Sequence, residues 1–283
     1  MFFGISTLAF KNRKLSVEQL EQLRKAGYRH IELFANRPHF DYHDRTLTKE
    51  IAGWFNANGM PPPSLHMPFF ERLGTNSIRS ISALTPEKLH RMDALDELKR
   101  ALELSDWTSI SYVVIHLGTI HQRFHPVALD HAYTMIDTIR EFAGVEILIE
   151  NIPNEFSTLE RIREFTDVAR LPDVRICYDT GHGQLQGPVP RLERVAAIHL
   201  NDNGGELDDH LWPFEGTINW PRLIEEIVLS DYHGSMVFEV HDEGIERGWE
   251  KRARIEELLV DARLSLNEFR EKYDFRRDDD DLH

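Results

Sequence analysis

Eight short apolar segments alternate with amphipathic segments along the chain, and this alternation restricts the possible folds most strongly. The apolar segments have the length of strands and contain few polar residues, which is typical of parallel strands buried on both faces. They begin near residues 2, 29, 63, 111, 145, 173, 195 and 235. Eight strand–helix units in 283 residues favour a single closed (β/α)8 TIM barrel of the α/β class over an open doubly wound sheet.

Helix start signals lie between these apolar segments, where the alternation requires them. Ser16 predicts the N-cap of the first helix, with Gln19 three residues later completing a capping box. Later helices are expected to begin at Thr85-Pro86, Ser157-Thr158 and Trp220-Pro221. Neither a G-x-G-x-x-G nor a G-x-x-x-x-G-K-[ST] motif follows the first strand, which argues against an open nucleotide-binding sheet.

We expect one barrel domain over residues 1–265 and a C-terminal extension over residues 266–283. The extension contains the run Arg276-Arg277-Asp278-Asp279-Asp280-Asp281. A charged run of this kind is typical of a solvated segment, so the sequence predicts a disordered acidic end.

Composition places the chain among globular proteins and limits its partners. Hydrophobic residues make up 41% of it, and the formal net charge is −15, which makes a nucleic-acid partner unlikely. The only cysteine, Cys177, excludes an intrachain disulfide and suits a reducing compartment. No apolar run has the length of a membrane span, and Met1–Leu8 lacks the basic residues that begin a signal peptide. We therefore expect a cytoplasmic protein without a membrane partner.

Six of the predicted strands end in a histidine or a carboxylate. Leaving such a group buried without a partner costs several kcal/mol, so a shared partner is expected. The six residues are His66, His116, Glu150, Asp179, His199 and Glu239. In a barrel of this type the carboxyl ends of the strands form the active site, and His182, Asp208 and His210 follow in the adjacent loops. Imidazole nitrogens together with carboxylate oxygens suit Mn²⁺, Mg²⁺, Co²⁺ or Zn²⁺.

A divalent ion at this position predicts proton transfer next to a carbonyl group. The ion would hold two substrate oxygens and stabilise an enediolate, while Glu150 and Glu239 remove and return the proton. His182 could hold a substrate hydroxyl. The alternative for His66 and His116 is a structural role as hydrogen-bonded core histidines. Glu32 at the end of the second strand could either join the site or cap it, and Cys177 is expected to fill the barrel core.

Four runs resemble the xylose-isomerase-like barrel superfamily. They are Ile149-Glu150-Asn151, Tyr178-Asp179-Thr180-Gly181-His182, Ile198-His199-Leu200-Asn201-Asp202 and Phe238-Glu239-Val240. The loop that begins at Asp208-Asp209-His210 is similar to that of many sugar isomerase/epimerase-like members. The resemblance covers about residues 1 to 265 and includes sugar isomerases, ketose epimerases, inosose dehydratases and metal-dependent apurinic-site endonucleases.

The single-metal epimerases of that superfamily imply a four-residue ligand set. It consists of Glu150, Asp179, His199 and Glu239. The two glutamates would exchange protons, and His182, His66 and His116 would contact the substrate. The sequence departs from the epimerases in lacking a clear match to their extra substrate-binding acid, for which only Glu155 lies near.

The endonuclease branch implies a three-zinc cluster built from more residues. The additional ligands would be His66, His116, His182, Asp208 and His210. Phe69 and Phe70 would then be a wedge for an abasic site, although they could equally wall a sugar pocket. The loops near the third and seventh strands are not notably basic, which argues against DNA. The charged residues that they carry are Glu71, Arg72, Glu206, Asp208 and Asp209.

The sequence thus predicts a divalent-metal-dependent isomerase or epimerase of a sugar or polyol, acting through an enediolate and without an organic cofactor. The alternatives are an apurinic-site endonuclease-like phosphodiester hydrolase, a dehydratase of a keto-polyol and a barrel that has lost its activity. Pairing of two barrels into a homodimer stays open.

Overall fold

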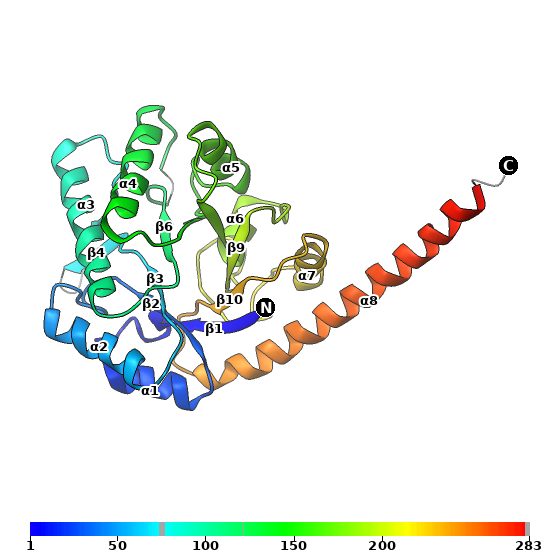
Figure 1. Cartoon of the computed structure of the whole chain (residues 1–283), viewed down its shortest axis with the longest axis horizontal. Coiled ribbons are helices and arrows are strands. Elements are labelled where there is room, and N and C mark those ends of the chain that lie inside the picture. Colours follow the sequence, from blue (N-terminus) through cyan, green and yellow to red (C-terminus); the bar gives the residue numbers. More distant parts are fainter. Residues whose placement is uncertain (74–76, 121, 281–283) are drawn as a thin grey trace.

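Eight parallel strands close into a barrel, as predicted (Figure 1). The structure is a computed structural model that describes residues 1–73, 77–120 and 122–280. The barrel strands are β1 Phe2–Ser6, β2 His30–Phe34, β3 Ser64–His66, β6 Val113–His116, β7 Ile147–Glu150, β8 Arg175–Asp179, β9 Val195–Leu200 and β10 Ser235–Phe238. Around the barrel the order is β1, β10, β9, β8, β7, β6, β3, β2, so chain neighbours pair and β10 closes onto β1.

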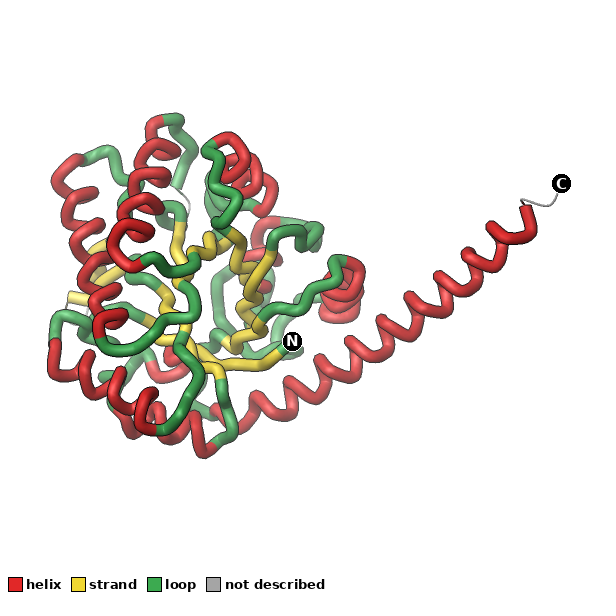
Figure 2. The backbone as a smooth tube through the Cα atoms, viewed as in Figure 1, coloured by secondary structure: helices red, strands yellow, loops and turns green. Residues whose placement is uncertain are grey.

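Helices form the layer outside the strands (Figure 2). They are α1 Val17–Lys25, α2 Arg45–Ala57, α3 Lys88–Leu102, α4 Val127–Ala143, α5 Leu159–Val168, α6 Thr180–Gln186, α7 Trp220–Leu229 and α8 Gly248–Asp280, with short 3-10 turns η1 Thr7–Phe10, η2 Glu103–Asp106 and η3 Ile245–Arg247. The predicted capping box is present, since the Gln19 side chain accepts from the Ser16 N–H at 2.6 Å. Thr158 caps α5 as predicted, whereas α3 begins at Lys88, shortly after Thr85-Pro86.

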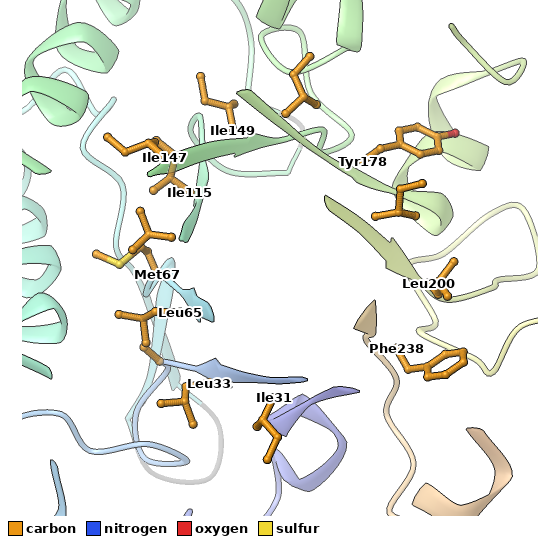
Figure 3. Close-up of a cluster of buried hydrophobic side chains, with 14 of the residues drawn as sticks. Ile31, Leu33, Leu65, Met67, Ile115, Ile147, Ile149, Tyr178, Leu200 and Phe238 are labelled. Atoms are coloured by element: carbon orange, nitrogen blue, oxygen red, sulfur yellow. The ribbon is translucent and has the colours of Figure 1, made fainter. Parts of the chain in front are cut away.

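Alternation along the strands decides which residues face the helices and which face the barrel axis. Ile115, Ile149 and Tyr178 belong to the large core between strands and helices, and Figure 3 shows such side chains around the ring of strands. Val114, Leu148, Cys177 and Ala197 form a separate small cluster with Tyr112, so Cys177 fills the core as predicted. Each of these four residues lies two positions before a site residue, which therefore shares its face.

A two-stranded antiparallel hairpin follows β3, and the sequence did not indicate it. It consists of β4 Phe70–Leu73 and β5 Ser77–Ser80. Glu71 of the hairpin and Glu97 of α3 both bind Arg37 and Arg79, with nitrogen–oxygen distances of 2.8 to 3.1 Å. The signal is weak because these strands are held by ion pairs and not by an apolar face.

Residues 266–280 of the predicted extension belong to helix α8, and the disorder of the acidic end stays a prediction. Helix α8 continues to Asp280 and extends beyond the barrel (Figure 1), while Asp281 lies outside the described residues. After Gly248 the helix contains neither glycine nor proline, so no residue type that breaks a helix interrupts it. The division at residue 265 remains a prediction. Among residues 1–73, 77–120 and 122–280, no helix is long and apolar enough to cross a membrane.

Candidate metal centre

Nine histidine and acidic residues at the carboxyl ends of the strands form three groups of the kind that binds metal ions. The groups are His66, His116 and Glu150; Glu150, Asp179, His199 and Glu239; and His182, Asp208 and His210. Within each group one ligand atom per residue lies within 4.8 Å of the others. The structure therefore brings together every residue that the sequence assigned to the site, and Glu150 belongs to two groups.

The first group is built around one carboxylate oxygen. Glu150 Oε2 lies 3.0 Å from His66 Nε2 and 3.1 Å from His116 Nε2. His66 Nδ1 lies 3.1 Å from the carbonyl oxygen of Met67, which can only accept, so Nδ1 carries the proton. In a neutral His66 the Nε2 lone pair therefore points at a carboxylate oxygen. That contact is unfavourable unless the ring is protonated or a cation lies between the two atoms.

The loop after β9 supplies most of the third group. Asp208 Oδ2 lies 3.2 Å from both His182 Nε2 and His210 Nε2. His210 Nδ1 donates to the carbonyl of Glu239 at 2.8 Å, which again leaves Nε2 as the atom directed at the group. His210 also has a φ of 49°, a left-handed conformation that non-glycine residues adopt mainly where surrounding structure imposes it.

The second group lies deepest in the barrel. His199 Nδ1 is 3.0 Å from Glu239 Oε2 and 3.6 Å from Glu150 Oε2. Its Nε2 is 3.3 Å from Glu32 Oε2, so Glu32 stands behind His199 and fixes the ring. This arrangement matches the carboxylate–histidine pairs that orient metal ligands in proteins. Glu32, which the sequence left open, supports a site residue from behind.

Burial and charge act against each other on the pKa values of these groups. Burial alone would raise the pKa of Glu150, but His116 and His199 outweigh it and hold that pKa well below its usual value. Burial lowers the pKa of His182, yet Asp179, Asp208 and Glu150 reverse this and hold it well above its ordinary value. His210 shows the same balance, with a pKa raised to about 9. The site attracts positive charge strongly.

Several buried atoms lack the hydrogen bonds that such atoms normally make. Glu150 Oε1 and His182 Nδ1 lie 3.0 Å apart, but neither has a hydrogen-bond partner among the described residues. His199 Nδ1 and Asp208 Oδ1 are also without one in that part of the chain. Buried polar atoms without partners call for a missing ligand. Because nitrogen and carboxylate donors converge on them, the residues present fit divalent cations.

Residues behind the ligands fix them in place, and sequence reasoning assigned none of these a role. Asn151 Oδ1 accepts from the Asp179 N–H at 2.7 Å, and Asp179 Oδ1 accepts from the His182 N–H at 2.7 Å. A Cβ at Gly181 would lie 2.0 Å from Asn201 Oδ1, so only glycine leaves room for the Asn201 side chain at this position. The sequence signal that could have identified these residues is an asparagine close to an acid at the end of a strand.

Asp202 organises the loop that carries the third group. Its buried carboxylate accepts from the Phe214 N–H at 3.0 Å, the Ile218 N–H at 3.1 Å and the Trp220 Nε1–H at 2.8 Å. These bonds connect the end of β9 to both the far side of the loop and the start of α7. Asp202 thereby restricts the loop that contains Asp208 and His210.

The site opens into a cavity of about 170 Å³. All of the nine residues except Asp179 and His199 line it, as do Phe34, Phe69 and Phe70. Lys11 and Arg72 line it as well, and sequence reasoning missed both because neither ends a strand. Glu155 is absent from the lining and accepts from the Phe124 N–H, so it does not replace the missing epimerase acid.

Lys11 is expected to reduce stability at neutral pH. Burial and the positive charge of Arg72 lower its pKa from 10.5 to about 8. Since the folded pKa is the lower one, the cost is fully present below pH 8 and disappears as the pH rises from 8 to 10.5. Lys11→Met should therefore raise the midpoint of thermal unfolding at neutral pH, and the gain should shrink at alkaline pH. The exposed Lys14→Met is the control; an equal effect of both variants would contradict the interpretation.

The fold and the strand-end residues define an α/β barrel of the class that carries enzymatic sites at its carboxyl face. The chain belongs to the family described as "Xylose isomerase-like TIM barrel", whose model matches residues 20–259. Two curated relatives are uncharacterized proteins of Sinorhizobium fredii and Methanocaldococcus jannaschii, 26% and 27% identical. The match covers 61% and 48% of this chain, and the chain spans 63% and 58% of their lengths.

Named relatives come from both branches of the family. A "Probable endonuclease 4" of Methanocorpusculum labreanum is 26% identical over 227 residues, covering 68% of this chain and 75% of that protein. A solved "D-tagatose 3-epimerase-like protein" superposes with a TM-score of 0.73 at 20% identity, covering 94% of this chain and all of the other. The IOLI protein, solved with a bound zinc atom, superposes with a TM-score of 0.65 at 15% identity, covering 93% and 98%. At these identities the structural matches show the fold alone.

Proposed function

We propose that the chain is a metal-dependent hydrolase of a small phosphate ester, with up to three divalent ions, two of which would share Glu150. The observation that carries the proposal is the convergence of four imidazoles on this one carboxylate. Besides His66 and His116, His182 Nδ1 lies 3.0 Å and His199 Nδ1 3.6 Å from its oxygens. A site for a single ion does not require this many ligand atoms.

The same observation weakens the role of Glu150 as a mobile base. An enediolate mechanism needs a carboxylate free to approach a substrate C–H on each side. Glu150 is fully buried, and both of its oxygens are directed at histidine nitrogens. Its carboxylate is better suited to bridging cations than to moving protons.

The residues around the cavity can perform what ester hydrolysis requires of the protein. Bound divalent ions would neutralise a phosphate and make a water molecule more acidic. Glu239 lines the cavity. Burial alone would raise its pKa, but His199 outweighs this and lowers it to about 2, so Glu239 is ionised and can accept a hydrogen bond from the attacking water. Phe34, Phe69 and Phe70 give the cavity an apolar part of its wall.

A sugar isomerase or epimerase, which the sequence analysis preferred, is the second candidate. Glu150 and Glu239 both line the cavity, and its aromatic wall would suit a sugar ring. The net charge of −15 also disfavours duplex DNA under either candidate, so we expect a small substrate. The similarity to endonuclease 4 proteins is compatible with the first candidate, whereas the epimerase-like structure shares the fold and does not separate the two.

Metal content and two assays separate the candidates. The hydrolase should contain about three divalent ions per chain, one for each group of ligands, and should cleave bis(p-nitrophenyl) phosphate. An isomerase should contain about one ion and should exchange solvent deuterium into aldose or ketose substrates. Chelation followed by re-addition of Zn²⁺, Mn²⁺, Mg²⁺ or Co²⁺ controls for metal lost in purification. One ion per chain together with deuterium exchange and no ester cleavage would overturn the first proposal.

A further inference from the structure

Two cationic side chains, Lys11 and Arg72, line the cavity, and neither has an ion-pair partner within residues 1–73, 77–120 and 122–280. Lys11 directly follows η1, while Arg72 belongs to β4, so two distant segments bring them to one place. Neither side chain makes a hydrogen bond or an ion pair with another described residue. In a chain with 48 acidic and 33 basic residues, two unpaired cations beside one cavity need an explanation.

The hairpin holds Arg72 toward the cavity. Successive residues of a strand point to opposite faces, so Phe70 and Arg72 share one face and Glu71 lies on the other. Phe70 and Arg72 both line the cavity, whereas Glu71 binds Arg37 at 2.9 Å and Arg79 at 2.8 Å. The ion pairs of Glu71 anchor the strand from behind and thereby fix the direction of Arg72.

Lys11 stays charged at neutral pH although its surroundings oppose the charge. Burial and Arg72 lower its pKa to about 8, and Asp208, which acts in the opposite direction, already binds His182 and His210. The positive charge at the mouth therefore comes from Lys11 and Arg72.

We propose that Lys11 and Arg72 form a subsite for a second anionic group of the substrate, next to the phosphate that the metal centre would receive. This inference rests on the proposed function and narrows its substrate class to small phosphate esters that carry a further phosphate or carboxylate. Binding sites commonly keep a charged side chain that lowers the stability of the folded protein, because binding of the ligand requires the charge. Charge-assisted hydrogen bonds from the two cationic side chains would stabilise a bound phosphate or carboxylate more than an uncharged group.

Binding of non-hydrolysable phosphonates to the metal-loaded protein tests the subsite. Phosphonoacetate, phosphonopropionate and phosphonobutyrate are compared by calorimetry with alkylphosphonates of the same length. We expect at least one member with a terminal carboxylate to bind about tenfold more tightly than its uncharged counterpart. A parallel series that ends in a second phosphonate distinguishes a phosphate from a carboxylate as the preferred group.

Substitutions of Lys11 and Arg72 test whether these two residues cause the preference for a second anionic group. Lys11→Met combined with Arg72→Met should remove the preference, so that each ligand with a terminal carboxylate binds no more tightly than its alkylphosphonate counterpart, and Lys11→Arg combined with Arg72→Lys should restore the preference. Lys14→Met, an exposed lysine three residues away, is the matched control. Equal affinities in the wild type, or a preference that survives the double Met variant, would overturn the subsite. A preference without any ester hydrolysis would leave the subsite standing and reject the hydrolase instead.

Discussion

Glu150→Gln should abolish turnover and remove most of the bound metal. Glu150 is a member of two ligand groups, so the amide weakens both at once, and only His182, Asp208 and His210 keep a complete set. We expect at most one ion per chain and a loss of activity of about a thousandfold or more, the upper range for removing one preorganised charged group. Elemental analysis and bis(p-nitrophenyl) phosphate cleavage measure the two effects.

The control for this variant is a glutamate at the opposite end of the same strand. Glu146 precedes β7 and binds Arg175 at 2.6 Å, far from the ligand groups along the strand. Glu146→Gln should retain its metal and activity. If Glu150→Gln kept three ions and wild-type activity, the shared-carboxylate model would be wrong. Loss of activity with all metal retained would instead support a proton-transfer role, as in the isomerase.

Asp202→Ala should destabilise the protein by about 3 kcal/mol or more. Several buried N–H groups would lose a charged acceptor at once, and each unsatisfied buried donor costs about 1–3 kcal/mol. The affected donors are the backbone N–H groups of Asn203, Phe214 and Ile218 and the indole N–H of Trp220. Urea unfolding of the metal-free protein measures the loss of stability.

The same variant should also affect the third metal group selectively. The loop it releases carries Asp208 and His210, while His66, His116 and Glu150 lie on other strands. We expect the metal content to fall by about one ion relative to the wild type. Glu206→Ala, an exposed acid in the same loop, is the control. Unchanged stability and metal content in Asp202→Ala would show that the loop is held by other contacts.

The barrel and its ligand residues could be predicted because they depend on local pattern. A short apolar run that ends in a histidine or a carboxylate, such as Val113-Val114-Ile115-His116, indicates a buried strand. It also indicates the end of the barrel at which the last residue lies. The hairpin was not predictable in the same way, since β4 and β5 depend on ion pairs from Glu71 to Arg37 and Arg79, which lie on separate segments. Ion pairs between separate segments produce no local pattern that can be recognised in the sequence.

The sequence by itself determined the fold class and which strand-end residues come together at the site. Strand length, alternation and the chemistry of each strand end are properties of neighbouring residues. They can therefore be recognised without the tertiary structure. Only the tertiary structure decided that nine residues divide into three groups, two of which contain Glu150. It also decided that Glu32 stands behind His199 and that Lys11 and Arg72 line the same cavity. Those relations depend on distances between side chains from different strands and loops. Closure of the barrel sets these distances, and no local pattern encodes them.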